Sequence, residues 1–168
     1  MQRELLLLRH GKSDWGQHLS DYRRPLTARG RKEAARIGQW LVEQGMEPDH
    51  IISSPAERAR QTAEIAAAAM HFPQDTIQWM ESLYMADVQT LVEVIHNAPE
   101  QSSTLMLVGH NPAMEELLLF LADEEPELPE DGKLLPTATV AGLFLKGQWK
   151  DLGSESCSVI FTQRGKDC

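Results

Sequence analysis

Two arginines and two histidines stand where buried segments of the sequence end. Arg9 and His10 directly follow four leucines, Arg58 follows "ISSPAE", and His110 follows the apolar run "TLMLVG". A guanidinium presents a fork of donors that matches phosphate oxygens, and it keeps its charge. A neutral imidazole can attack phosphorus, and a protonated one can stabilise the oxygens of the transition state. Together these side chains predict a site that binds a phosphoryl group and transfers it to a histidine.

Alternating strand and helix patterns would bring these residues together. Short continuous apolar runs are typical of strands covered on both faces, and apolar positions three and four residues apart indicate helices. We predict elements in the order β-α-β-α-β-α-β-α-β-β, over residues 4–9, 27–45, 50–53, 54–70, 76–80, 87–97, 104–109, 111–122, 137–147 and 156–165. This order predicts an α/β fold, a three-layer α/β/α sandwich with a mainly parallel central sheet, as a single domain over residues 1–168. Ligands bind at the carboxyl ends of such strands.

Several polar residues and one glycine are expected to set the helix boundaries. Thr27 is a candidate N-cap, and Gly45 can provide a left-handed stop. Ser54 and Glu57 have the spacing of a capping box. Asn111 is a candidate cap for the helix that carries "PAMEELLLFL".

Composition narrows the possible partners of the 168-residue chain. Its formal net charge of −9 argues against a nucleic-acid partner. No apolar run approaches the roughly 20 residues that cross a bilayer, so we expect no membrane partner and a cytoplasmic location. A monomer is the simplest expectation for the oligomeric state.

The stretch "DEEPELPED" at 123–131 holds six of the 25 acidic residues. We expect a solvated insertion, and a functional lid is the alternative. If this loop bordered the pocket, it would repel acidic partners and favour basic ones. Near the C-terminus, Cys157, Val159 and Phe161 are expected on one strand face, with Cys157 buried and inert.

A metal site is the rival interpretation, because histidines also bind zinc or iron. Two guanidinium groups would repel a dication, and no carboxylate stands at the strand ends, so we predict no metal. Taken singly, each residue has a structural explanation: Arg9 and His10 could cap a strand, Arg58 could be a surface charge, and His110 could be a satisfied structural histidine. Their joint placement favours the phosphoryl site.

Four motifs in order, "LLLLRHGKS", "RPLTARG", "SSPAERARQT" and "VGHNP", resemble those of the histidine phosphatase superfamily, which has the phosphoglycerate-mutase-like fold. The motif "RHGKSDW", the element D-x-x-R-P-L from Asp21 to Leu26 and the chain length are similar to the short phosphohistidine phosphatases of the SixA type. The resemblance implies that His10 is the nucleophile that becomes phosphorylated. It also implies that Arg9 and Arg58 bind phosphoryl oxygens and that water then releases phosphate.

The same resemblance makes His110 the second histidine of the pocket and implies no cofactor. Lys12, Ser13 and Asn111 are further candidates for lining the pocket, with a solvated loop charge as the alternative for Lys12.

Larger members of the superfamily place an acidic general acid after the third strand, where this chain has Met85 in "SLYMAD". Glu81 and Asp87 are the nearest candidate acids. Their structural alternatives are a loop charge for Glu81 and a helix N-cap for Asp87. An imidazole leaving group has a pKa near 6.5 and departs more readily than an alkoxide, so a site without a strong acid suits phosphohistidine.

Three functions remain open from the sequence. The first is a phosphatase that forms a phosphohistidine intermediate and acts on phosphohistidine in a protein, with a histidine-containing phosphotransfer domain as a candidate partner. The second is a phosphatase of the same fold for small phosphate esters, with Glu81 or Asp87 as the acid. The third is a binding module that holds a phosphorylated partner without turnover.

Overall fold

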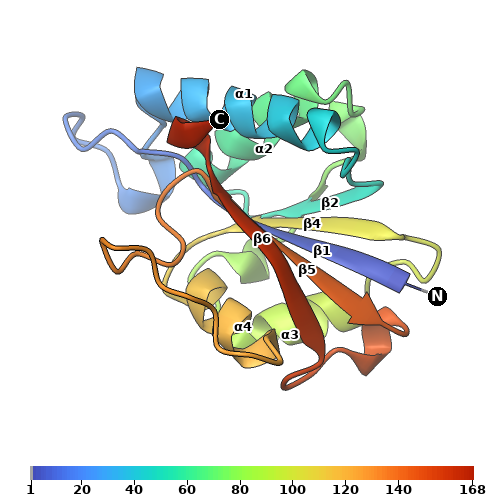
Figure 1. Cartoon of the computed structure of the whole chain (residues 1–168). Helices are drawn as coiled ribbons and strands as arrows, with labels where there is room; N and C mark the ends of the chain where they lie inside the picture. Colours follow the sequence, from blue (N-terminus) through green and yellow to red (C-terminus); the bar gives the residue numbers. More distant parts are fainter. Residues whose placement is uncertain (1) are drawn as a thin grey trace.

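A six-stranded sheet separates two layers of helices, as Figure 1 shows. The coordinates are a computed structural model that describes residues 2–168. The strands are β1 (Gln2–Arg9), β2 (His50–Ser53), β3 (Gln78–Trp79), β4 (Thr104–Gly109), β5 (Thr139–Lys146) and β6 (Cys157–Arg164). The helices are α1 (Ala28–Glu43), α2 (Glu57–Ala69), α3 (Val88–His96) and α4 (Ala113–Leu121), with short 3-10 turns that include η1 (Asp21–Arg23) and η5 (Gly165–Asp167).

The strand order β3-β2-β4-β1-β5-β6 places the functional strand ends side by side. β3, β2, β4 and β1 are parallel to one another, whereas β5 is antiparallel to both β1 and β6. In this register Arg9 lies opposite Gly109, and Ser53 lies opposite Val108. The carboxyl ends of β1, β2 and β4 therefore meet at one edge, as the predicted fold requires.

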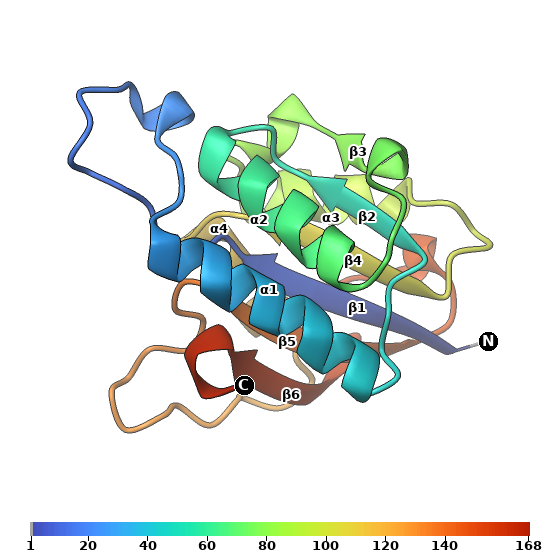
Figure 2. The same ribbon diagram turned by 90° about the horizontal axis from the view of Figure 1, so that it is seen from above.

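The central strand β1 is buried on both faces. Leu5 and Leu7 pack into the cluster under α3 and α4, and Leu6 and Leu8 pack into the cluster under α1 and α2. All four leucines have no exposed surface, which explains the continuous apolar run. Figure 2 shows β1 passing between the helix layers toward the loop that carries the next residues. The predicted three-layer α/β/α arrangement is confirmed.

Two of the predicted helix boundaries are confirmed. The Thr27 side chain accepts from the Gly30 N–H, and Gly45 has a φ of +68°. The predicted cap at Ser54 is wrong, because α2 begins at Glu57 and the Ser54 hydroxyl accepts from the Ala56 N–H at 3.3 Å.

Other boundaries shift by a few residues. α4 begins at Ala113, although the Asn111 Oδ1 still accepts from the Glu115 N–H of its first turn at 3.2 Å. The strand predicted over 76–80 is reduced to the two residues of β3. No helix within residues 2–168 has the length and apolar character needed to cross a membrane.

The predicted common face of Cys157, Val159 and Phe161 is wrong in part. Cys157 is buried, and Val159 packs on the same core cluster. The pairing of β5 with β6 is irregular between Gly142 and Leu143, and Phe161 packs on the opposite cluster. An extra residue in one strand reverses the faces that follow it.

Candidate active site

A cavity of about 280 Å³ opens at the sheet edge where β1, β2 and β4 end. It brings together all four side chains that the sequence singled out, although their positions span about a hundred residues of chain. His10 follows β1, Arg58 lies in the first turn of α2, and His110 follows β4. The lining residues are Arg9, His10, Lys12, Ser13, Trp15, Arg24, Arg58, His110, Asn111 and Thr137.

His10 is held in one tautomer by its own loop. Its Nδ1 lies 2.7 Å from the carbonyl oxygen of Gly11, which can only accept, so Nδ1 carries the proton and Nε2 keeps its lone pair. Burial lowers the pKa of His10 to about 3, and the positive field of Arg58 and Arg9 acts in the same direction. His10 is therefore a neutral imidazole at pH 7, the form that can attack phosphorus.

Two hydrogen bonds through the Thr62 hydroxyl, here called the relay, connect the loop after His10 to α2. The Gly11 N–H donates to the Thr62 Oγ1 at 3.0 Å, and the Thr62 hydroxyl donates to the carbonyl of Arg58 at 2.7 Å. Both Gly11 and Thr62 are buried, so these bonds are shielded from water. The relay fixes the backbone beside His10 relative to the backbone of Arg58.

His110 faces His10, with ring centroids 5.2 Å apart. Its Nε2 lies 2.8 Å from the Ser54 hydroxyl, and its Nδ1 is buried without a hydrogen-bond partner in the described part of the chain. Burial, followed by the charge of Arg58, lowers the pKa of His110 to about 4. This disagrees with the expectation that the second histidine stays protonated at pH 7. A phosphoryl dianion at hydrogen-bond distance would raise that pKa.

Asp21 holds the guanidinium of Arg58 in one orientation, although the sequence assigned no role to Asp21. The Arg58 Nη1 donates to the Asp21 carbonyl at 2.6 Å, and its Nη2 donates to the Asp21 Oδ2 at 3.0 Å. The buried Arg58 Nε has no hydrogen-bond partner within residues 2–168. Asp21 thus fixes one edge of the guanidinium.

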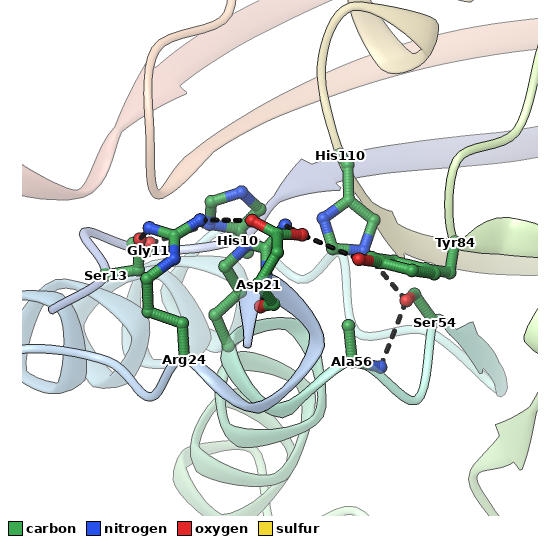
Figure 3. Close-up of polar contacts among 10 residues, drawn as sticks. His10, Gly11, Ser13, Asp21, Arg24, Ser54, Ala56, Tyr84 and His110 are labelled. Atoms are coloured by element: carbon green, nitrogen blue, oxygen red, sulfur yellow. Dashed lines mark hydrogen bonds and ion pairs between the residues drawn. The ribbon is translucent and has the colours of Figure 1, made fainter. Parts of the chain in front are cut away.

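The Asp21 carboxylate accepts hydrogen bonds from two further side chains, as Figure 3 shows. The Tyr84 hydroxyl donates to its Oδ2 at 2.7 Å, and the Arg24 Nη2 donates to its Oδ1 at 2.9 Å. These bonds, the one from Tyr84 first, hold the pKa of Asp21 well below its usual range. The same bond raises the pKa of Tyr84. The Asp21 carboxylate is therefore ionised and serves as an acceptor.

Arg24 continues this network to the outer rim of the cavity. Its Nη1 donates to the Ser13 hydroxyl, and its guanidinium lies 3.5 Å from the ring centre of Trp15. Trp15 is 75% exposed, so the stack stands at the mouth of the cavity. The further candidates for lining the pocket, Lys12, Ser13 and Asn111, do line the cavity.

Arg9, the last residue of β1, also lines the cavity. Its Nη1 donates to the Leu135 carbonyl at 3.3 Å, and its buried Nε has no partner in the described chain. The Asn111 amide donates to the same carbonyl at 2.9 Å. Burial lowers the pKa of Arg9 below its usual value, and the charge of Glu115 opposes this effect. Arg9 and Arg58 thus both line the cavity, and each is held by a hydrogen bond to a backbone carbonyl.

Glu81 and Asp87, the two candidate acids, lie outside the cavity. Glu81 is exposed and accepts from the Tyr22 hydroxyl at 2.8 Å, and Asp87 caps α3 by accepting from the Thr90 N–H at 2.9 Å. Neither lines the cavity. Met85 is 84% exposed. The cap at Asp87 confirms its predicted structural role.

No residue of the acidic loop 123–131 lines this cavity, although Asp131 lines a smaller hollow that shares Lys12 and Thr137 with it. Residues 123–127 of the loop line a separate hollow with residues 158–162 of β6, and Asp131 is paired with Arg164. Within residues 2–168, no group of three histidine, cysteine, aspartate or glutamate side chains is arranged to hold a metal ion.

Comparison with known proteins identifies the family. The sequence profile of the histidine phosphatase superfamily (branch 1) matches residues 5–83, which carry three of the four motifs. An uncharacterized protein of Mycobacterium tuberculosis, Rv1276c, is 32% identical over 149 residues, which cover 86% of this chain and 91% of the relative. The chain belongs to the histidine phosphatase superfamily.

Solved structures give this histidine phosphatase a SixA-type fold. A protein from Nakamurella multipartitia, provisionally named phosphohistidine phosphatase SixA, superposes with a TM-score of 0.80 and 27% identity over 98% of this chain and 96% of that one. The provisionally named SixA of Agrobacterium tumefaciens gives a TM-score of 0.76 and 28% identity over 96% and 97%. The predicted phosphoglycerate-mutase-like fold is thereby confirmed.

The sequence missed the residues that orient this site. Asp21 and Arg24 belong to the quoted D-x-x-R-P-L element, which was the available signal for them. Tyr84 lies in a segment without periodicity and gave no signal. Ser54 was interpreted as a helix cap, whereas it contacts His110.

Proposed function

We propose that this protein is a phosphatase that hydrolyses phosphohistidine in a protein substrate through a phosphoenzyme at His10. The observation that carries the proposal is the buried, neutral His10, with its Nδ1 bound to the Gly11 carbonyl, between Arg9 and Arg58. This arrangement leaves one imidazole nitrogen able to attack an anion that the two guanidinium groups would bind.

The reaction takes two displacements at phosphorus. The substrate ring first takes a proton from water on its unphosphorylated nitrogen. The His10 Nε2 lone pair then forms a bond to phosphorus while the bond from phosphorus to the substrate imidazole breaks, and the released nitrogen keeps the electron pair, so that a neutral imidazole leaves. Water then attacks the phosphorus of phosphorylated His10. This second step yields inorganic phosphate and restores the His10 imidazole for the next cycle.

Arg9 and Arg58 would supply the charge that the transition state needs. Both line the cavity with His10 and are fixed by hydrogen bonds to backbone carbonyls, and guanidinium donors of fixed orientation stabilise developing oxyanion charge. His110, 5.2 Å from His10, would donate to a phosphoryl oxygen once the bound dianion raises its pKa.

The residues around the cavity favour phosphohistidine over an ester. No carboxylate lines the cavity, and the two candidate acids bind other groups. An imidazole leaving group needs less help from an acid than an alkoxide does. The provisional SixA names of the structural relatives agree with this substrate class.

Phosphoenzyme trapping tests the proposal. A protein carrying 32P on histidine should transfer label to wild type and not to His10→Ala, and the label on the enzyme should have the acid lability of phosphohistidine. A panel of sugar phosphates and other alkyl phosphates should be cleaved at least about 100-fold more slowly, since an alkoxide must leave without an acid. Faster ester cleavage would instead support the small-molecule phosphatase, and binding without label transfer would support the non-catalytic module.

A further inference from the structure

Two more hollows continue from the catalytic cavity along one edge of the molecule. One, of about 400 Å³, lies beside Arg9 and includes Lys133, and the other, of about 190 Å³, extends from Lys133 to Lys166. Lys12 and Thr137 line both hollows as well as the catalytic cavity. The three hollows therefore form one continuous surface that begins at the proposed phosphoryl site.

Arg164, the last residue of β6, holds the part of the loop that carries Lys133. Arg164 donates to both carboxylate oxygens of Asp131, at 2.7 and 2.9 Å, and to the carbonyl of Lys133 at 3.0 Å. The Lys133 N–H donates to the Asp131 Oδ1 at 3.0 Å. The backbone of Lys133 is thus held by two groups, the guanidinium of Arg164 and the carboxylate of Asp131. Its ammonium forms no salt bridge in the described chain.

The other end of this loop is tied to the catalytic residues. The Leu135 carbonyl accepts from Arg9 and from Asn111, and the Ala138 N–H donates to the carbonyl of His10 at 3.0 Å. Figure 2 shows the loop running beside the C-terminal segment. The position of Lys133 relative to His10 is therefore set by hydrogen bonds at both ends of the loop.

This surface is lined by eight basic and three acidic residues, although the chain has a net charge of −9. One of the acidic residues, Glu115 in the hollow beside Arg9, accepts from the Asn111 amide at 3.4 Å. The smallest hollow is lined by five basic and two acidic residues. The two acidic residues are already paired, Glu33 with Arg29 and Asp131 with Arg164. The remaining cations form no salt bridge within residues 2–168, and they are Lys12, Lys133 and Lys166.

Four acidic residues, those within 123–127, lie on a different surface. Residues 123–127 gather against β6, in a hollow that shares no lining residue with the three above. Charges of opposite sign are therefore separated, and an approaching partner meets the lysines next to the catalytic cavity.

We infer that the strip formed by Lys12, Lys133 and Lys166 is a docking surface for acidic side chains that flank the phosphohistidine of a protein substrate. The inference rests on the proposed function and names the partner's chemistry. A protein surface is the favoured occupant because the strip extends from the catalytic cavity through two further hollows to the C-terminal turn η5, beyond a single phosphoryl group. Exposed charges of this kind act mainly on the rate of association, and salt screens them.

A pair of peptides of equal length provides the probe, one with glutamates on both sides of a central histidine and one with lysines in their place. Binding of the unphosphorylated peptides is measured by fluorescence anisotropy, and hydrolysis is measured on their phosphohistidine forms. The binding assay does not require turnover, so the docking surface is tested even if the proposed function fails. The variant is Lys133→Glu with Lys166→Glu, and the matched control is Lys146→Glu with Lys150→Glu, which makes the same charge change at exposed sites outside the strip.

We expect wild type and the control to bind the acidic peptide about 10-fold more tightly than the basic one at low salt, and to lose most of this preference at high salt. The Lys133/Lys166 variant should lose or reverse the preference in binding and in kcat/KM. Equal binding of both peptides by wild type, or a preference for the basic one, overturns the inference. The inference is also overturned if the variant loses as much kcat/KM for fructose 1,6-bisphosphate as for the acidic phosphopeptide. The lysines would then bind a second phosphate of a small molecule. If neither phosphopeptide is hydrolysed while the binding preference persists, the proposed function fails and the docking surface stands.

Discussion

Tyr84 and Arg58 donate to the same oxygen of Asp21. The Tyr84 hydroxyl lies 2.7 Å from the Asp21 Oδ2, and the Arg58 Nη2 lies 3.0 Å from it. The ring of Tyr84 also contacts His110, with centroids 5.6 Å apart. Asp21 therefore connects a residue beside one histidine to the guanidinium proposed to bind phosphate, although no carboxylate lines the cavity itself.

Asp21→Asn should weaken catalysis by loosening Arg58. The amide loses the ionic component of its bonds to Arg58 and Arg24, each worth about 1.5–3 kcal/mol when charge-assisted. We expect kcat/KM to fall roughly 10- to 100-fold, in line with that energy. Because Asp21 positions Arg58 and does not touch the proposed reacting atoms, Asp21→Glu should recover part of the loss. Steady-state kinetics with separate kcat and KM values provide the measurement.

Asp14→Asn is the matched control for this variant. Asp14 lies in the same loop, and its carboxylate accepts from the Gly16 N–H and the Gln17 amide outside the cavity. Wild-type kcat/KM is expected. An Asp21→Asn enzyme as active as this control would remove Asp21 from any positioning role.

The buried His10 should make the protein sensitive to acid. Its pKa is about 3 in the folded protein and near 6.5 when unfolded, so the unfolded state binds more protons between these values. The free energy of unfolding should therefore fall as the pH drops from about 6.5 toward 3, with the full contribution of His10 present above 6.5. Urea unfolding at several pH values should show a shallower decline for His10→Gln than for wild type.

His18→Gln, at an exposed loop position, is the control for this measurement and should follow the wild-type curve. His110, whose pKa is about 4, contributes in the same direction, so the decline in His10→Gln is reduced and not abolished. Parallel curves for wild type and His10→Gln would contradict the proposed burial of a neutral His10.

Asp87 and Glu81 should prove dispensable for turnover of phosphohistidine. Asp87→Ala removes the cap of α3 and should lower the free energy of unfolding. Its kcat should stay within about twofold of wild type, and so should that of Glu81→Gln, because neither carboxylate lines the cavity. Thermal unfolding and phosphopeptide turnover measure the two effects. A drop of about 100-fold in kcat for either variant would identify a general acid.

Gly30→Ala should destabilise the protein, although alanine is ordinarily the better helix former. A Cβ at Gly30 would lie 2.3 Å from the carbonyl oxygen of Lys12, where α1 packs on the loop after His10. Overpacking of this kind costs about 1–3 kcal/mol, which exceeds the roughly 1 kcal/mol gain in helix propensity. The displaced loop should also lower kcat/KM. Denaturant unfolding would give the sign of the stability change.

Gly153→Ala serves as the comparison, since a Cβ there meets no atom within 4 Å. It should leave activity at the wild-type level. A Gly30→Ala protein that is more stable than wild type would show that the loop after His10 moves freely away from α1.

Local chemistry in the sequence was enough to predict the layers and the strand ends. The apolar run before Arg9 required a strand buried on both faces, and the carboxyl ends of neighbouring parallel strands must share one edge. Thr27 and Asp87 acted as caps where their side chains could reach the N–H groups three residues later. These features depend on residues close together in the chain, which is why the sequence determined them.

Only the tertiary structure decided how the site is oriented. Asp21 reaches Arg58 and Tyr84 across 37 and 63 residues, and Arg164 reaches Asp131 across 33, from loops and turns that have no periodic pattern. The pKa values of the two histidines depend on burial by elements distant in sequence. The sequence alone determined which histidines and arginines stand at the strand ends. Packing decided which nitrogen atoms of these side chains have no hydrogen-bond partner, because burial and hydrogen bonding depend on neighbours in space.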